Sequence, residues 1–79
     1  MLLNPDAVTP LYKQMEDLLM ERIASGEFQP GDRLPSVEEL ANEYGVSVVT
    51  VRRAIDNLSQ KDVVTKKQGK GTYVNARVF

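Results

Sequence analysis

The sequence contains no cysteine, no histidine and no tryptophan among its 79 residues. Without cysteine no disulfide can form, and without cysteine and histidine the common zinc ligand sets are missing. The same absences remove the thiol nucleophile and the side chain that most often acts as general acid or base, and no phosphate-binding loop pattern is present. A chain this short also has little material with which to enclose a pocket. We therefore expect no enzyme, no metal and no cofactor.

Long apolar runs are missing as well. No run approaches the roughly 20 residues that a membrane-spanning helix needs. The first six residues lack the basic segment and apolar core of a secretory signal. These features predict a single small cytoplasmic domain with no membrane association, stabilised by ordinary apolar packing.

The charges are distributed unevenly along the chain. The net charge is -1, but residues 1–45 hold three basic and nine acidic residues, whereas residues 46–79 hold seven basic and two acidic residues. The two parts therefore carry net charges of -6 and +5. Such polarity favours a scaffold with one anion-facing surface. Chance clustering in a small protein is the alternative.

The first apolar stripe predicts a helix that ends near Ser25. Thr9 is the expected N-cap, Pro10 suits the first helical position, and Gly26 suits the stop. The stripe recurs at helical spacing and consists of Leu11, Met15, Leu18, Leu19 and Ile23. Three acidic residues lie off this stripe and are expected in solvent: Glu16, Asp17 and Glu21.

Two further helices follow, with a tight turn between them. Ser36 and Glu39 have the spacing of a capping box, which begins a helix that ends at Gly45. Ser47 is placed to cap the next helix, which runs to about Leu58. Its buried stripe is expected to be Val51, Ala54, Ile55 and Leu58. Two short helices joined by a glycine-bearing turn are typical of a helix-turn-helix, and a plain helical hairpin is the alternative.

The periodicity then changes from helix to strand. Residues 63–65 and 72–74 have strand character, and the basic, glycine-bearing stretch 66–71 lies between them. Directly after a helix-turn-helix, we interpret this as a wing; a solvated hairpin loop is the alternative. Arg33 and Leu34 are predicted to form a very short strand. The expected fold is therefore mainly α with a small β-hairpin, a winged helix-turn-helix with a two- or three-stranded wing.

The order and spacing of several short segments identify a family. The segments are Pro10-Leu11-Tyr12-Lys13-Gln14-Met15, Pro30-Gly31-Asp32-Arg33-Leu34-Pro35-Ser36, Leu40-Ala41, Gly45-Val46-Ser47, Thr50-Val51-Arg52-Arg53-Ala54 and Gln68-Gly69-Lys70-Gly71-Thr72-Tyr73-Val74. The sequence resembles the N-terminal DNA-binding domain of the GntR family of bacterial transcription regulators, and its last two segments are most similar to the HutC branch.

The resemblance implies that the second helix of the helix-turn-helix enters the major groove and that the wing tip meets the neighbouring minor groove. It implies a repressor whose C-terminal domain, absent here, binds a small-molecule effector and dimerises. The expected partner is double-stranded DNA with a pseudo-palindromic operator. The full-length form is expected to be a homodimer, and this fragment a monomer or a weak dimer. A winged-helix module that contacts protein without binding DNA is the alternative.

The sequence departs from the family pattern at two positions. Glu38 and Val48 stand where family members often carry DNA-contacting arginines, and Val48 offers only an apolar contact, for example to a thymine methyl group. The resemblance assigns DNA contact to Ser36, Ser47, Thr50, Arg52, Gln68, Gly69, Lys70 and Gly71. We add Arg53, Lys66 and Lys67 to the expected DNA contacts, because each is basic and lies close in sequence to residues of this set. We expect an N-terminal arm at residues 1–8, the domain at 9–75, and the start of a linker or a frayed end at 76–79.

Overall fold

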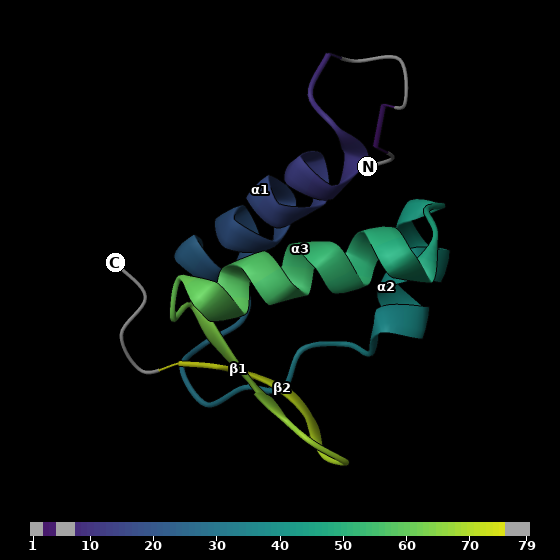
Figure 1. The fold of residues 1–79 in the computed structure, drawn as a ribbon. Coiled ribbons are helices and arrows are strands. Elements are labelled where there is room, and N and C mark those ends of the chain that lie inside the picture. The colour runs from purple at the N-terminus through teal and green to yellow at the C-terminus, as the bar shows by residue number, and fades with distance from the viewer. Residues whose placement is uncertain (1–2, 5–7, 76–79) are drawn as a thin grey trace.

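A computed structural model describes residues 3–4 and 8–75, which form three helices followed by a hairpin (Figure 1). The elements are α1 (Leu11–Ala24), α2 (Val37–Tyr44), α3 (Val48–Gln60), β1 (Val64–Lys67) and β2 (Gly71–Val74). The predicted winged helix-turn-helix is confirmed. Most of the predicted N-terminal arm and all of the predicted segment 76–79 lie outside the described residues.

Helix α1 begins one residue later than the sequence predicted. Pro10, not Thr9, occupies the N-cap, with an extended ψ of 151° and no side-chain cap bond. Its carbonyl accepts hydrogen bonds from the backbone N–H groups of Lys13 and Gln14, both at 3.1 Å. The Gln14 side chain instead donates to the carbonyls of Thr9 at 2.7 Å and Asn4 at 2.8 Å. A side-chain amide thus secures the segment before α1, where a threonine cap was expected.

Helix α3 is the central element of the fold. It packs against α1, α2 and β1, and Figure 1 shows α1 crossing it while α2 lies near its beginning. Its stripe is buried as predicted, because the four stripe residues are at most 3% exposed. The core consists of Met15, Leu19, Ile23, Leu34, Leu40, Ala41, Tyr44, Val51, Ala54, Ile55, Leu58, Val63, Val64 and Val74. None of the helices in the described ranges is both long and apolar enough to cross a bilayer.

The prediction that Glu16 lies in solvent was wrong. The residue is 3% exposed, and the spacing of α1 puts it at the edge of the apolar stripe. Its carboxylate accepts hydrogen bonds from the Asn57 Nδ2 at 3.3 Å and from the Lys61 ammonium, and Lys13 Nζ lies 3.9 Å away. A buried carboxylate is tolerated where donors satisfy it. This cluster ties α1 to the end of α3, whereas Asp17 and Glu21 are exposed as predicted.

A third segment, residues 32–34 between α1 and α2, lies along the hairpin and is joined to it by an isolated bridge. Strands β1 and β2 pair antiparallel, and Arg33 forms an isolated bridge with Tyr73. Around that bridge, the Leu34 N–H donates to the Thr72 carbonyl and the Val74 N–H donates to the Asp32 carbonyl, at 2.8 and 2.9 Å. The predicted short strand at 33–34 is therefore present in outline, and β2 is the middle of three aligned segments.

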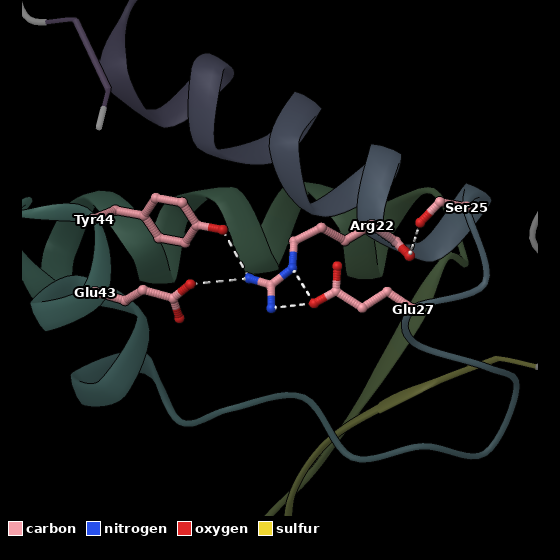
Figure 2. A network of polar contacts seen from close by, with 5 residues as sticks. All are labelled: Arg22, Ser25, Glu27, Glu43 and Tyr44. Carbon is pink, nitrogen blue, oxygen red and sulfur yellow. Dashed lines mark hydrogen bonds and ion pairs between the residues drawn. The ribbon is translucent and has the colours of Figure 1, made fainter. Parts of the chain in front are cut away.

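Arg22 links the end of α1 to the segment just after it and to the end of α2 (Figure 2). Its guanidinium donates to the Glu27 carboxylate at 2.8 and 2.5 Å and to the Tyr44 hydroxyl at 2.7 Å, and it pairs with Glu43 at 3.4 Å. The same group lies 4.6 Å from the centroid of the Phe28 ring. The end of α1, the residues just after it and the end of α2 thus share one cation, which fixes the first helix of the helix-turn-helix against α1.

Candidate nucleic-acid interface

The turn between α2 and α3 has the geometry that the sequence predicted. Gly45 ends α2 in the left-handed region, with φ 68°, which glycine adopts without strain. Ser47 caps α3, because its Oγ accepts from the Thr50 N–H at 3.1 Å. The two hydroxyls also lie 3.0 Å apart and share one hydrogen bond. Since each hydroxyl carries one donor, the pair keeps one O–H for an outside acceptor such as a phosphate.

The two adjacent arginines of α3 are in different situations. The Arg53 guanidinium lies 3.9 Å from the centroid of the Tyr12 ring, a cation–π contact that joins α3 to α1. Arg52 is exposed, and within the described part of the chain its guanidinium has no hydrogen-bond or ion-pair partner. Arg52 has all five of its donors available.

The basic stretch between the predicted strands is partly strand itself. Lys66 and Lys67 lie in β1, paired with Thr72 and Gly71, so the strand continues beyond the stretch 63–65 that showed strand character, and it begins at Val64. A three-residue turn suffices to reverse the chain, which lets the ladder continue two residues further. Both lysines are exposed, as is common on edge strands. Lys66 forms an ion pair with Asp56 of α3.

The two lysines of β1 face different neighbours, as alternation along a strand requires. Lys66 meets α3 through Asp56, whereas Lys67 Nζ lies 4.8 Å from the centroid of the Tyr73 ring. The ion pair neutralises an acidic side chain on α3 and ties the wing to that helix. Neither lysine stands at the tip of the wing.

The tip of the wing is the short turn Gln68-Gly69-Lys70. The Lys70 N–H donates to the Lys67 carbonyl at 2.9 Å, which closes a four-residue β-turn over residues 67–70, and Gly69 has φ 75° at its third position. A positive φ at that position is what a type II turn requires. Gln68, Gly69 and Lys70 are all exposed. Figure 1 shows the hairpin leaving the end of α3 and projecting its turn beyond the helices, on the side away from α1.

The start of α2 has the predicted capping box. The Ser36 Oγ accepts from the Glu39 N–H at 3.0 Å, and the Ser36 N–H donates to the Glu39 carboxylate at 2.9 Å. The hydrogen bond from the Ser36 backbone has the largest effect on the pKa of Glu39, followed by the bond with the Ser36 side chain. Together they hold that pKa below its usual value. The Ser36 hydroxyl still has its own donor for an external group. Glu38 is exposed beside it.

Arg33 is a candidate that the sequence reasoning did not assign. Its side chain crosses Gly71, where an added Cβ would lie 2.7 Å from the Arg33 Nε. A cavity of about 160 Å³ adjoins it, lined by Arg33, Leu34, Pro35, Ser36, Val37, Ile55, Gly71 and Thr72. Arg33 thus stands between the wing and the start of α2, two elements that each hold assigned contact residues. In the sequence, the only indication that Arg33 is a candidate for DNA contact was its position three residues before the assigned contact residue Ser36.

The assigned residues fall into three groups on the structure. Ser47, Thr50, Arg52 and Arg53 belong to α3 and its cap; Lys66, Lys67, Gln68, Gly69, Lys70 and Gly71 belong to the wing; and Ser36 caps α2. Hydroxyls, cations and a glycine-bearing turn are groups that contact phosphates and base edges. The described residues hold no cluster of three or more carboxylates suited to a metal ion.

Sequence comparison with known proteins matches this chain to one family of bacterial regulators. The family model "Bacterial regulatory proteins, gntR family" matches residues 11–74. The Escherichia coli (strain K12) mannosyl-D-glycerate transport/metabolism system repressor MngR is 49% identical over 65 residues, which are 82% of this chain and 27% of the relative. The histidine utilization repressor of Klebsiella aerogenes is 37% identical over 68 residues, 86% of this chain and 28% of the relative. The chain thus spans little more than a quarter of these relatives.

Solved structures agree with the sequence comparison. YtrA from Sulfolobus acidocaldarius, a GntR-family transcription factor, has a TM-score of 0.85 at 39% identity, covering 95% of this chain and 79% of that one. AraR(DBD) in complex with operator ORE1 has a TM-score of 0.83 at 32% identity, covering 91% and 88%. The resemblance inferred from the sequence segments is thereby confirmed. The chain belongs to the gntR family of bacterial regulatory proteins.

Proposed function

We propose that this chain is the sequence-specific DNA-binding domain of a bacterial transcription repressor. One observation carries the proposal: Arg52, on the second helix of a helix-turn-helix, is exposed and without a partner in the described residues. An arginine so placed has its donors available for base edges or phosphates in the major groove. The fold is shared with AraR(DBD), whose structures include an operator.

The roles that we propose follow from chemistry and position. Arg52 makes a bidentate contact with a guanine or a phosphate. Ser47 and Thr50 donate to a phosphate or a base edge near the start of α3, where free N–H groups also favour an anion. Lys70, flanked by Gly69 and Gly71, approaches the minor groove and the sugar-phosphate wall.

The remaining assigned residues take supporting roles. Gln68 at the turn and Ser36 at the start of α2 contact the DNA backbone, and Lys67 adds an electrostatic contribution. Lys66 already pairs with Asp56, and Arg53 already contacts the Tyr12 ring. To bind DNA, each of these side chains must either contact it while keeping its present partner or leave that partner. We therefore expect smaller losses of affinity from these two than from Arg52.

We further propose the organisation of the longer protein. Relatives named as repressors are several times longer than the part matched here. The length of these relatives supports a further domain, which we propose to be C-terminal and to bind the effector. We propose that the full-length protein is a homodimer, located in the cytoplasm and bound to a pseudo-palindromic operator. Residues 9–75 would form the DNA-binding unit, with an arm before and a linker after it. A lone domain should bind weakly, because two linked copies on two half-sites gain effective concentration.

The experiment is selection of bound sites from random DNA, followed by titration of the selected site and of mixed-sequence DNA. Arg52→Ala should weaken binding to the selected site by about 1–3 kcal/mol and relax specificity at one base step. Lys70→Ala should weaken binding more evenly across sequences. Lys13→Ala is the matched control, since it removes one positive charge from α1. If Arg52→Ala lowers the affinity for selected and for mixed-sequence DNA equally, Arg52 contacts only phosphate.

Salt dependence tests the electrostatic basis of binding. If each protomer neutralises about five phosphates, log affinity should fall against log salt with a slope near -4 to -5. A flat response would refute the electrostatic interpretation. Absence of binding to mixed-sequence DNA at low salt would instead support the alternative, a winged-helix module that contacts protein.

A further inference from the structure

Val49 is an exposed apolar residue on the helix proposed to enter the major groove. It is 71% exposed, and among the described residues only Val8, at 101%, is a more exposed large apolar side chain. Nothing in the folding of α3 requires valine there, because β-branched residues are weaker helix formers than alanine or the long polar residues. The neighbouring Val48 is different: it is half-buried and packs against the core.

The geometry of α3 puts Val49 at the centre of its outward face. The buried stripe is Val51, Ala54, Ile55 and Leu58. At about 100° per residue, Val49 points roughly opposite to the mean direction of that stripe. On the same ideal helix, Arg52 lies about 60° to one side of Val49 and Arg53 about 40° to the other. The single apolar group on this face therefore stands between two arginines.

The charges around Val49 favour an approach to DNA. Arg52 is unpaired in the described residues, so its positive charge is available. Asp56, two turns after Val49 on nearly the same line, is paired with Lys66 of the wing, which offsets its repulsion of phosphates. In the major groove, the one apolar group on a base edge is the C5-methyl group of thymine. An exposed valine at the centre of a cationic face has this group as its matching partner.

We propose that Val49 is a specificity-determining residue that contacts the C5-methyl group of a thymine. The inference rests on the proposed function and adds to it the recognition of one base group, the thymine methyl. Val49 lies three residues before Arg52, or about 4.5 Å along the helix axis, and successive bases are about 3.4 Å apart. The thymine therefore lies within about two base pairs of the position that Arg52 contacts.

The test begins with sites selected from unmethylated synthetic DNA, in which thymine is the only base with a C5-methyl group. Each thymine of the selected half-site is replaced in turn by deoxyuridine, which removes the methyl group and keeps the pairing edge. At one position this should weaken binding of the wild-type chain about fourfold, the effect of losing one buried methyl group. Fluorescence anisotropy at low salt measures the affinities.

Variants then assign the methyl dependence to a residue. Val49→Ala should bind thymine and deoxyuridine at that position equally, whereas Val8→Ala, the matched control at an exposed valine, should keep the fourfold difference. Alanine is the better helix former, so Val49→Ala should keep the helical circular dichroism signal of the wild type. A fourfold difference that persists in Val49→Ala would overturn the proposal.

The outcomes separate this inference from the proposed function. If no site is enriched and the wild-type chain shows no salt-dependent binding, the proposed function fails and this inference fails with it. If sites are enriched but no thymine-to-deoxyuridine exchange changes the affinity, the inference alone fails. Enriched half-sites without thymine near the position affected by Arg52→Ala would overturn it in the same way.

Discussion

Replacing Glu16 by glutamine should destabilise the domain, although the residue is far from the proposed DNA contacts. The substitution keeps the size of the side chain and an oxygen that accepts from Asn57, but it removes the negative charge that pairs with Lys61. The ammonium of Lys61 then loses its partner, while the new amide must satisfy its own donors in a nearly closed site. The perturbation thus isolates the charge within the contact between α1 and the end of α3.

The magnitude follows from the exposure of the two partners. The side chain of Glu16 is 4% exposed, whereas that of Lys61 is 52% exposed. Breaking a fully buried ion pair costs about 3–5 kcal/mol, and an exposed pair contributes less than about 1 kcal/mol. Because water can solvate the freed lysine, we expect a loss of about 1–2 kcal/mol in the free energy of unfolding. In a domain of this size, that corresponds to a melting temperature lower by about 5–15 °C.

The loss should depend on pH. Burial, the largest influence, raises the pKa of Glu16, but hydrogen bonds from Lys61 and Asn57 and the charge of Lys13 together lower it below its ordinary 4.5. A carboxyl group with a lower pKa in the folded state stabilises the fold above its unfolded pKa, and this contribution is lost as pH falls through the folded value. The wild type should therefore exceed Glu16→Gln in stability near pH 7, and the difference should shrink progressively below about pH 4.5.

Thermal and urea unfolding, followed by far-ultraviolet circular dichroism from pH 7 to pH 3, measures this difference. Glu21→Gln is the matched control, because Glu21 is an exposed carboxylate of the same helix and its loss should change stability by less than about 0.5 kcal/mol. Equal stability of Glu16→Gln and wild type at pH 7 would refute the reasoning. So would a deficit that stays constant across the acid range.

Three further predictions concern the elements that hold the interface in place. Ser36→Ala should cost about 0.5–2 kcal/mol of unfolding free energy, since it removes the cap of α2; chemical denaturation checks this, and an unchanged midpoint would contradict it. Gly71→Ala should cost about 1–3 kcal/mol, because φ is 124° and the new Cβ displaces the Arg33 side chain; a melting temperature equal to wild type would contradict this. Arg22→Met should lower the melting temperature and loosen α2, seen as faster amide hydrogen exchange there than in α3; uniform exchange would show that the guanidinium network does not hold α2.

Features that depend on neighbours within four residues could be predicted from the sequence. The Ser36–Glu39 capping box and the Ser47 cap of α3 formed as expected, because a side chain and a backbone group three residues apart meet whenever the helix forms. Gly45 ended α2 for a similar reason, since its left-handed conformation is a property of one residue. The local error at Thr9 was a one-residue shift at a helix end, where the extended Pro10 takes the cap position.

Contacts between residues that are distant in sequence could not be predicted. The spacing of α1 puts Glu16 at the edge of the apolar stripe but does not reveal the partners that allow its burial, because Asn57 and Lys61 are 41 and 45 residues away. The same holds for the contact of Arg53 with the Tyr12 ring. Among the described residues, packing between α1 and α3 decides that Arg53 has a partner and Arg52 does not. The sequence shows two adjacent arginines and does not show which of them will meet a ring on another helix.

The sequence by itself determined the order of the elements, the caps of α2 and α3, the stripe that buries α3 and the family, because these depend on periodicity, on single residues and on short segments in a fixed order. Only the tertiary structure decided which charges are available. It pairs Lys66 with Asp56, stacks Arg53 on Tyr12, buries Glu16 and exposes Val49 beside an unpaired Arg52. The physical reason is that a charge is engaged or free according to what lies within a few ångströms of it, and in this fold those neighbours come from other helices and strands.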